Sequence, residues 1–110
     1  MEEEEIFYSE DLRPGDIISE KTRDHYELAR YIIVGREFEE EFNYYGREER
    51  YTTIYYRTII LKIGRSYDSI WAKTKNPGET YSLSEFEITT KHIWTRLFRS
   101  PLSWGKEGLL

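Results

Sequence analysis

Residues 51–72, YTTIYYRTIILKIGRSYDSIWA, consist largely of β-branched and aromatic side chains, which suit a pleated, half-buried surface. A Gly-Arg-Ser-Tyr-Asp break at residues 64–68 divides the stretch into two runs, which predicts a β-hairpin. In the first run, Ile59, Leu61 and Ile63 share one face of the predicted strand, and the other face is mixed. The stretch therefore indicates the centre of a mainly β fold.

The chain before this stretch predicts a long, twisted hairpin. Residues 29–36 predict a strand, whose apolar run Tyr31-Ile32-Ile33-Val34 suits a covered sheet, and Gly35 indicates a bend or bulge within it. Residues 37–50, EFEEEFNYYGREER, suit either a helical turn or a continuation of that strand. We favour the strand, which continues outward, turns near Tyr45-Gly46 and returns through residues 51–63. The outer part of this hairpin would be strongly acidic.

The chain after the stretch predicts a second turn, a strand and a C-terminal helix. Asn76-Pro77-Gly78-Glu79 has the composition of a type II turn, and residues 80–83 follow it as a strand. Ser82 and Glu85 have the spacing of a capping box for one helical turn. Residues 90–99 place Ile93, Trp94, Leu97 and Phe98 in one helical stripe, which favours a helix. A strand is the alternative there, because the segment is rich in β-branched residues.

The N-terminal part of the chain predicts a turn, a strand and a loop. Pro14-Gly15-Asp16 predicts a turn, because proline fixes one backbone dihedral angle and glycine accepts a positive φ. Ile17 and Ile18 begin the first strand. Residues 20–28 are mostly polar and indicate a long loop, with a short helix capped by Asp24 as the alternative.

Leu12-Arg13-Pro14-Gly15-Asp16-Ile17-Ile18 resembles the opening of many small Src-homology-3-like barrels of bacterial and phage proteins. The later order of loop, strands, hairpin and short helical turn is also similar, so the resemblance covers residues 11–88. It implies a small barrel. The hairpin at residues 37–50 and the chain after Thr89 lie outside the family's pattern. Because this fold hosts many unrelated functions, the resemblance assigns none.

Length and composition predict one domain in a reducing compartment. A chain of 110 residues has room for a single core, here with residues 11–88 as barrel, 90–99 as helix and 100–110 as tail. The sequence has no cysteine, and no apolar run reaches the length of a membrane span. The N-terminal Glu2–Glu5 run, expected to be mobile, is unlike a signal peptide. We therefore expect a cytoplasmic protein that does not contact membranes.

Charge is divided unevenly along the sequence and suggests a protein-binding surface. Residues 1–50 hold 16 acidic and 7 basic side chains, a balance of −9, whereas residues 51–110 hold 5 and 9, a balance of +4. An acidic hairpin arm would attract a basic surface on a partner, and tyrosine is enriched at interfaces. We expect a non-enzymatic binding module, a phage or bacterial regulator or inhibitor. The candidate partner-binding residues are Glu39, Glu40, Glu41, Tyr44, Tyr45, Glu48, Glu49 and Tyr51.

A nucleic-acid-binding barrel is the alternative function. Basic residues with aromatic neighbours recur in the second half of the chain, and stacking combined with cationic contacts is how barrels hold single strands. The candidate residues for this face are Trp71, Lys73, Lys75 and Arg96. Against it, the whole chain has a net charge of −5, whereas such proteins are usually basic.

The sequence predicts no catalytic, metal or cofactor site. Asp24, His25 and Glu27 are the nearest approach to a metal cluster, but ligands so close in sequence indicate a solvated polar loop. His92 adjoins the apolar stripe and suits the edge of a core better than the role of a base. No serine has a nucleophile-elbow context.

A homodimer is a further expectation for this chain. It would form through exposed strand edges or through the C-terminal tail.

Overall fold

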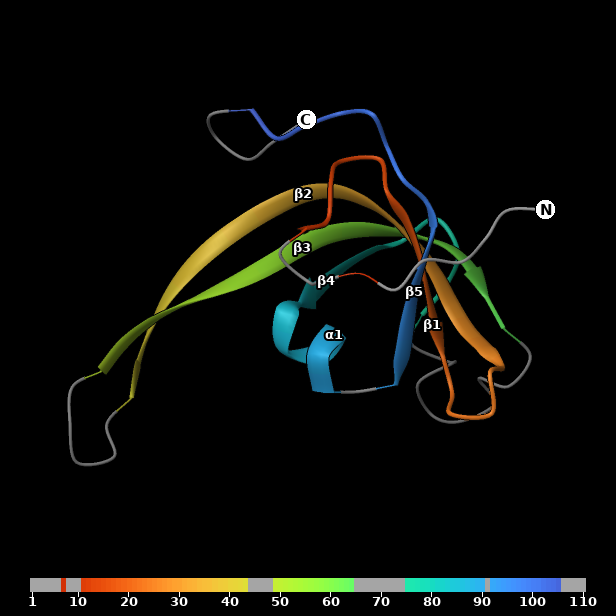
Figure 1. The fold of residues 1–110 in the computed structure, drawn as a ribbon, viewed down its shortest axis with the longest axis horizontal. Helices are drawn as coiled ribbons and strands as arrows, with labels where there is room; N and C mark the ends of the chain where they lie inside the picture. The colour runs from red at the N-terminus through yellow and green to blue at the C-terminus, as the bar shows by residue number, and fades with distance from the viewer. Residues whose placement is uncertain (1–6, 8–10, 44–48, 65–74, 91, 106–110) are drawn as a thin grey trace.

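A computed structural model of the chain describes residues 7, 11–43, 49–64, 75–90 and 92–105, without the side chains of residues 41–43, 49 and 50. Its elements are β1 (Ile17–Lys21), β2 (Glu27–Asn43), β3 (Glu49–Ile63), β4 (Thr80–Ser84), α1 (Glu85–Thr90) and β5 (Ile93–Phe98). The strands form one antiparallel sheet in the order β4-β3-β2-β1-β5 (Figure 1). The predicted mainly β fold is confirmed. No pairing among the described residues joins the edge strands β4 and β5, so the sheet is open.

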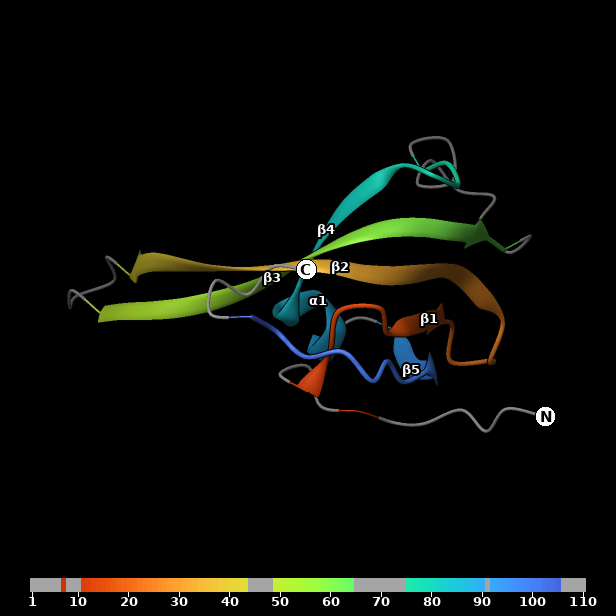
Figure 2. The same cartoon turned by 90° about the horizontal axis from the view of Figure 1, so that it is seen from above.

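The predicted long hairpin is also confirmed. β2 and β3 pair from Ala29–Ile63 at one end to Asn43–Glu49 at the other. Their outer halves extend beyond the other strands as a two-stranded ribbon, which arches away from the body in Figure 1 and runs clear of it in Figure 2. The turn predicted near Tyr45-Gly46 lies outside the described residues.

One side of the sheet carries the hydrophobic core. Alternate positions of the central strands point inward, and Tyr31, Ile33, Tyr56 and Ile60 are at most 1% exposed. Bulges interrupt the pairing of β2 with β3 at Arg30/Tyr31 and at Ile33/Gly35. A bulge adds one residue to a strand and increases its twist, so the predicted irregularity at Gly35 is confirmed. We call the side of the sheet away from this core the outer face.

Predictions for the turns are partly correct. The 76–79 turn is confirmed: the amide of Glu79 donates to the carbonyl of Asn76 at 3.2 Å, and Gly78 has a φ of 88°. The predicted strand at residues 80–83 is β4. The partner strand expected around Trp71 lies outside the described residues. The long loop predicted at residues 20–28 is wrong at both ends, because β1 continues to Lys21 and β2 begins at Glu27.

The helical turn predicted after residues 80–83 corresponds to α1, which begins later than its predicted cap. Ser84 is its N-cap: the amide of Glu87 donates to the Ser84 hydroxyl at 3.2 Å. The predicted Ser82–Glu85 capping box is therefore displaced by two residues, because Ser82 still pairs with Arg57 inside the sheet. The helix ends at Thr90 and buries Ile88.

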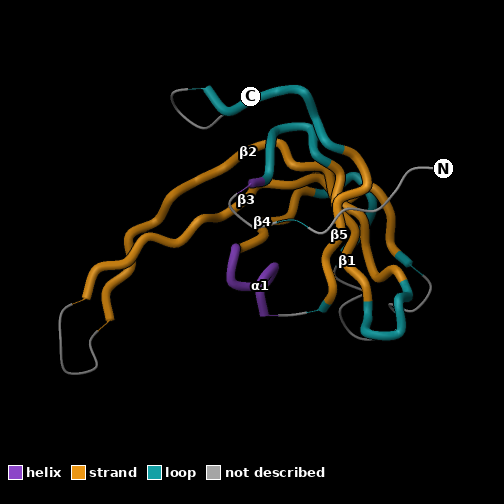
Figure 3. The backbone as a smooth tube through the Cα atoms, viewed as in Figure 1, coloured by secondary structure: helices purple, strands orange, loops and turns teal. Residues whose placement is uncertain are grey.

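The helix predicted over residues 90–99 is wrong. Residues 93–98 form β5, which pairs along β1, and Figure 3 shows α1 ending before this strand begins. His92, with a φ of 57°, separates the two elements. The supposed apolar stripe is divided, since Trp94 is 7% exposed in the core and Phe98 is 45% exposed. Pairing with a strand more than 70 residues earlier decides this segment, and helical spacing within it carries no information about that pairing.

Candidate functional site

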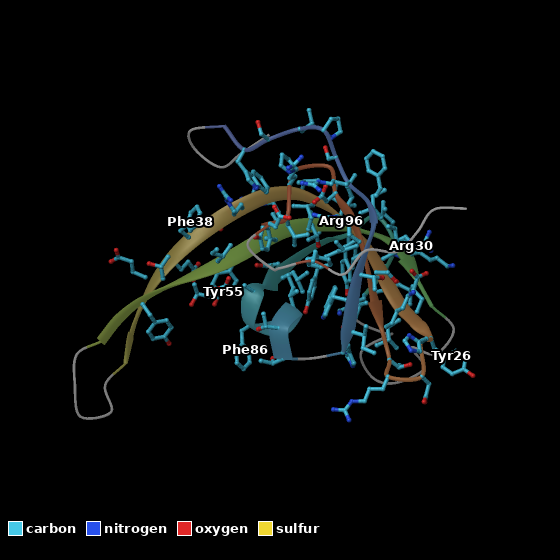
Figure 4. All side chains as sticks on the ribbon, in the orientation of Figure 1. Tyr26, Arg30, Phe38, Tyr55, Phe86 and Arg96 are labelled. Carbon is cyan, nitrogen blue, oxygen red and sulfur yellow. The ribbon has the colours of Figure 1, made fainter. Side chains whose placement is uncertain are left out.

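The outer halves of β2 and β3 form the acidic arm, which we define as residues 37–51. Glu37, Glu39 and Glu40 are exposed, as are Phe38 at 57% and Tyr51 at 48%. Figure 4 shows Phe38 on the ribbon, away from the body, and Tyr55 closer to α1. The arm is held by backbone pairing and presents its carboxylates in a fixed order. Of the predicted partner-binding residues, Glu39, Glu40 and Tyr51 lie here with described side chains.

The rest of the predicted partner site is described only in part. The register places Glu41 opposite Tyr51, and Glu49 opposite Asn43. Tyr44, Tyr45 and Glu48 lie outside the described residues. The structure therefore brings the two acidic sequences, before and after the turn, onto one paired ribbon.

The register divides the arm into two faces. Glu37 and Glu39 lie opposite Tyr55 and Thr53, and cross-strand partners share a face of the sheet. Phe38 lies opposite Ile54 on the other face. One face of the arm is thus acidic with tyrosine and threonine, whereas the other carries apolar side chains near its root.

The root of the arm is tied to the C-terminal tail. The guanidinium carbon of Arg36 lies 5.0 Å from the ring centre of Phe38 and 4.8 Å from that of Trp104. The indole nitrogen of Trp104 donates to the carbonyl of Leu12 at 2.8 Å, and its ring lies 6.5 Å from that of Tyr56. These contacts give the tail a docking position that the sequence did not indicate, and they anchor the arm where it leaves the body.

Two of the four residues predicted for a nucleic-acid face are buried in the structure. Arg96 is 2% exposed and its Nη1 lies 3.3 Å from the carboxylate of Asp16. Lys75 is 6% exposed, and its ammonium donates to the Tyr31 hydroxyl at 3.1 Å. Figure 4 shows Arg96 within the body rather than on a surface. Trp71 and Lys73 lie outside the described residues, so the structure gathers no basic face from this set.

A chain of titratable groups runs from the buried Lys75, Tyr31 and Glu20 to the partly exposed His92. Glu20, 5% exposed, accepts a hydrogen bond from the Tyr31 hydroxyl at 2.8 Å, and Tyr31 in turn accepts from Lys75. The other carboxylate oxygen of Glu20 lies 2.7 Å from Nδ1 of His92, whose side chain is 40% exposed. Sequence reasoning missed this cluster. Only alternation along β1, which points Ile18 and Glu20 to the same side, could have indicated it.

Glu27 takes part in an ion cluster rather than a metal site. Asp24 and His25 are exposed in the turn, whereas Glu27 accepts from the hydroxyl of Ser19 at 2.6 Å and pairs with Arg30 at 3.0 Å and Lys62 at 3.4 Å. No group of three or more His, Cys, Asp or Glu within the described part of the chain is placed to hold a metal ion. Burial alone would raise the pKa of Glu27, but these hydrogen bonds and cations outweigh it and lower the pKa below 4.5.

This lowered pKa predicts an acid-dependent contribution to stability. A carboxylate with a lower pKa in the folded state stabilises that state above the unfolded pKa, and the contribution disappears as the pH falls through the folded value. Glu27→Gln is expected to lower the free energy of unfolding at pH 7 by about 1 kcal/mol. The difference from the original chain should shrink as the pH falls below 4.5, as measured by urea unfolding across a pH series. A difference that stays constant across that series would contradict the assignment.

Comparisons with known proteins identify no relative: no family model, curated protein or solved structure matches this chain. Among the described residues, no helix combines the length and apolar content that a membrane crossing would require.

Proposed function

We propose that this chain is a non-enzymatic protein-binding module whose acidic arm engages a basic surface on its partner. The observation that carries the proposal is the exposure of Glu37, Glu39 and Glu40 along a hydrogen-bonded ribbon that extends beyond the core. A two-stranded ribbon that extends beyond the other strands contributes little to a core, so a long one that carries charge is better explained by contact with another molecule. A phage or bacterial regulator or inhibitor acting in the cytoplasm fits this description.

The body of the protein supports the proposal as a scaffold. Strand order β4-β3-β2-β1-β5, with a short helix between β4 and β5, agrees with the proposed relationship to small Src-homology-3-like barrels. In that reading the acidic arm is an insertion between two barrel strands. A ribbon that begins inside a packed sheet holds its charges in place, which reduces the entropy lost on binding.

Charge reversal of the acidic arm tests the proposal. Substitution of Glu39, Glu40, Glu41, Glu48 and Glu49 by lysine is expected to abolish capture of partner proteins from a bacterial lysate, because the attraction to a basic surface becomes repulsion. The readout is quantitative mass spectrometry of the captured proteins at two salt concentrations. The matched control reverses Glu2, Glu3, Glu4, Glu5 and Glu10, which changes the net charge equally outside the arm. If both variants lose capture of partner proteins equally, or if neither variant loses it, the arm is not the interface.

The nucleic-acid alternative is tested on the same protein. Single-stranded and duplex nucleic acid are titrated at low and high salt, and we expect no binding in the micromolar range because Lys75 and Arg96 are buried. Salt-sensitive micromolar binding would favour the alternative function and oppose the proposed one.

A further inference from the structure

A row of apolar side chains crosses the outer face of the sheet. Phe98 of β5 lies opposite Ile17 of β1, Ile17 lies opposite Ile32 of β2, and Ile32 lies opposite Ile59 of β3. Phe98 is 45% exposed, and the three isoleucines are partly exposed and lie outside the core cluster. Aligned, partly exposed apolar side chains of this kind on one sheet face are a mark of an interface.

The row borders a groove with a cationic edge. The groove has a volume of about 430 Å³ and is lined by Ile17, Arg30, Leu61, Lys62, Leu97 and Phe98. Arg30 and Lys62 lie opposite each other in the register. Their only described carboxylate partner is Glu27, so two cations share one anion and this end of the face keeps a positive balance. We call Arg30 and Lys62 the cationic end.

The acidic side of the arm is the other end of this same face. The bulge at Ile33/Gly35 adds a residue to β2, so that Gly35, Glu37 and Glu39 follow Ile32 on the outer face. Arg57 lies opposite Gly35 and pairs with Glu37. At about 3.3 Å per residue, Glu39 lies roughly 30 Å along the strand from Arg30. By register, the outer face of β2 and β3 is therefore cationic at one end and acidic at the other, with the apolar row nearer the cationic end.

We propose that two copies of this chain pack through this face, related by a two-fold axis. Such an axis places the acidic arm of each copy against the cationic end of the other, and the apolar row of each copy, beside its own cationic end, faces the base of the other copy's arm. A two-fold interface uses the same patch on both copies, so the patch must be complementary to itself, and opposite charges at its two ends meet that requirement. The inference rests on the proposed function, since it identifies the basic partner surface with the cationic end of a second copy.

Charge exchange between copies provides the test. The arm-reversed variant carries Glu39→Lys and Glu41→Lys; the triad-inverted variant carries Glu27→Lys, Arg30→Glu and Lys62→Glu, which preserves the local ion pairs with opposite signs. By symmetry each substitution acts twice in the dimer, so each variant alone is expected to dimerise at least roughly tenfold more weakly than the original chain. An equimolar mixture should recover a heterodimer, because both of its contacts join opposite charges. Sedimentation equilibrium at low and high salt measures both effects.

Two single substitutions test whether the effect depends on the outer face or only on the change in net charge. Glu39→Lys lies on the outer face and should weaken the dimer, whereas Glu40→Lys, opposite Thr52 on the other face, should change its dissociation constant by less than about twofold. Phe98→Glu introduces a charge into the apolar row at a side chain that is 45% exposed, and should give a monomer. Phe98→Glu also keeps the test decisive if the triad-inverted variant fails to fold, as monitored by circular dichroism.

The outcomes separate this inference from the proposed function. A chain that stays monomeric at every attainable concentration, or a mixture of the two variants that forms no heterodimer, overturns the second copy as the partner. If capture of another protein still depends on the arm in that case, the proposed function stands and the inference falls. If Glu39→Lys and Glu40→Lys weaken a dimer equally, the outer face is not the interface.

Discussion

Substitution of Asp16 by asparagine is expected to lower the free energy of unfolding by about 3 kcal/mol, with a fall in melting temperature of about 12 °C or more. Asp16 is 0% exposed and accepts from the amide of Arg13 at 2.9 Å and that of Ser100 at 2.6 Å. Its carboxylate also faces the guanidinium of Arg96 at 3.3 Å. Neutralising it removes a buried negative charge that faces the buried Arg96 guanidinium. Thermal unfolding followed by circular dichroism measures the effect.

Asp11 provides the matched control for this prediction. Its carboxylate lies 3.8 Å from the same arginine, but its side chain is 51% exposed. Water and salt screen an exposed pair, so Asp11→Asn should change the free energy of unfolding by less than about 1 kcal/mol. Equal losses for Asp11→Asn and Asp16→Asn would show that burial of the Asp16–Arg96 pair is not what stabilises this corner of the fold.

Substitution of Glu20 by alanine is expected to cost about 3 kcal/mol, the second largest effect. The change removes the acceptor of the Tyr31 hydroxyl and the partner of His92 at once, in a region from which water is largely excluded. Tyr31→Phe removes only the hydroxyl between Glu20 and Lys75 and should cost about 1.5 kcal/mol. Urea unfolding measures both losses.

Glu79 serves as the control for the buried cluster. It is exposed and accepts a hydrogen bond from Asn76 at 3.1 Å, so Glu79→Ala should cost less than about 0.5 kcal/mol. If Glu20→Ala is no more destabilising than Glu79→Ala, the cluster does not hold the body together. In that event, the placement of Glu20 and His92 next to each other would need an explanation other than stability.

Sequence patterns predicted the structure correctly where the contacts join residues that are close together in the chain. The long hairpin followed from one apolar run, one turn sequence and a second apolar run, because neighbouring strands joined by a short turn pair with each other. The same patterns failed at residues 90–99, where Trp94, Thr95 and Arg96 are buried by pairing with β1. These patterns also gave no sign that Lys75 and Arg96 are buried, because a cationic side chain is expected to be exposed unless its buried partner is known.

The candidate site shows the same division at the level of single residues. The sequence placed Glu39, Glu40 and Tyr51 on an acidic arm, and the arm exists. Simple alternation, however, would put Glu37 and Glu39 on the same face as Ile33, which is a core residue. The bulge at Ile33/Gly35 adds one residue and moves both acids to the outer face, with Ile32. A shift of one residue exchanges the two faces of a strand, so only the register assigns them.

The sequence by itself determined the mainly β class, the extent of the arm and its acidity, because side-chain alternation and turn residues act over a few positions along the chain. Tertiary structure alone decided that β5 is a strand, that Asp16 and Arg96 form a buried pair, and that the cationic end and the acidic side of the arm share one face. Each of these depends on which distant segments lie side by side. That choice is made by burial and hydrogen bonding of the whole chain, and no local pattern records it.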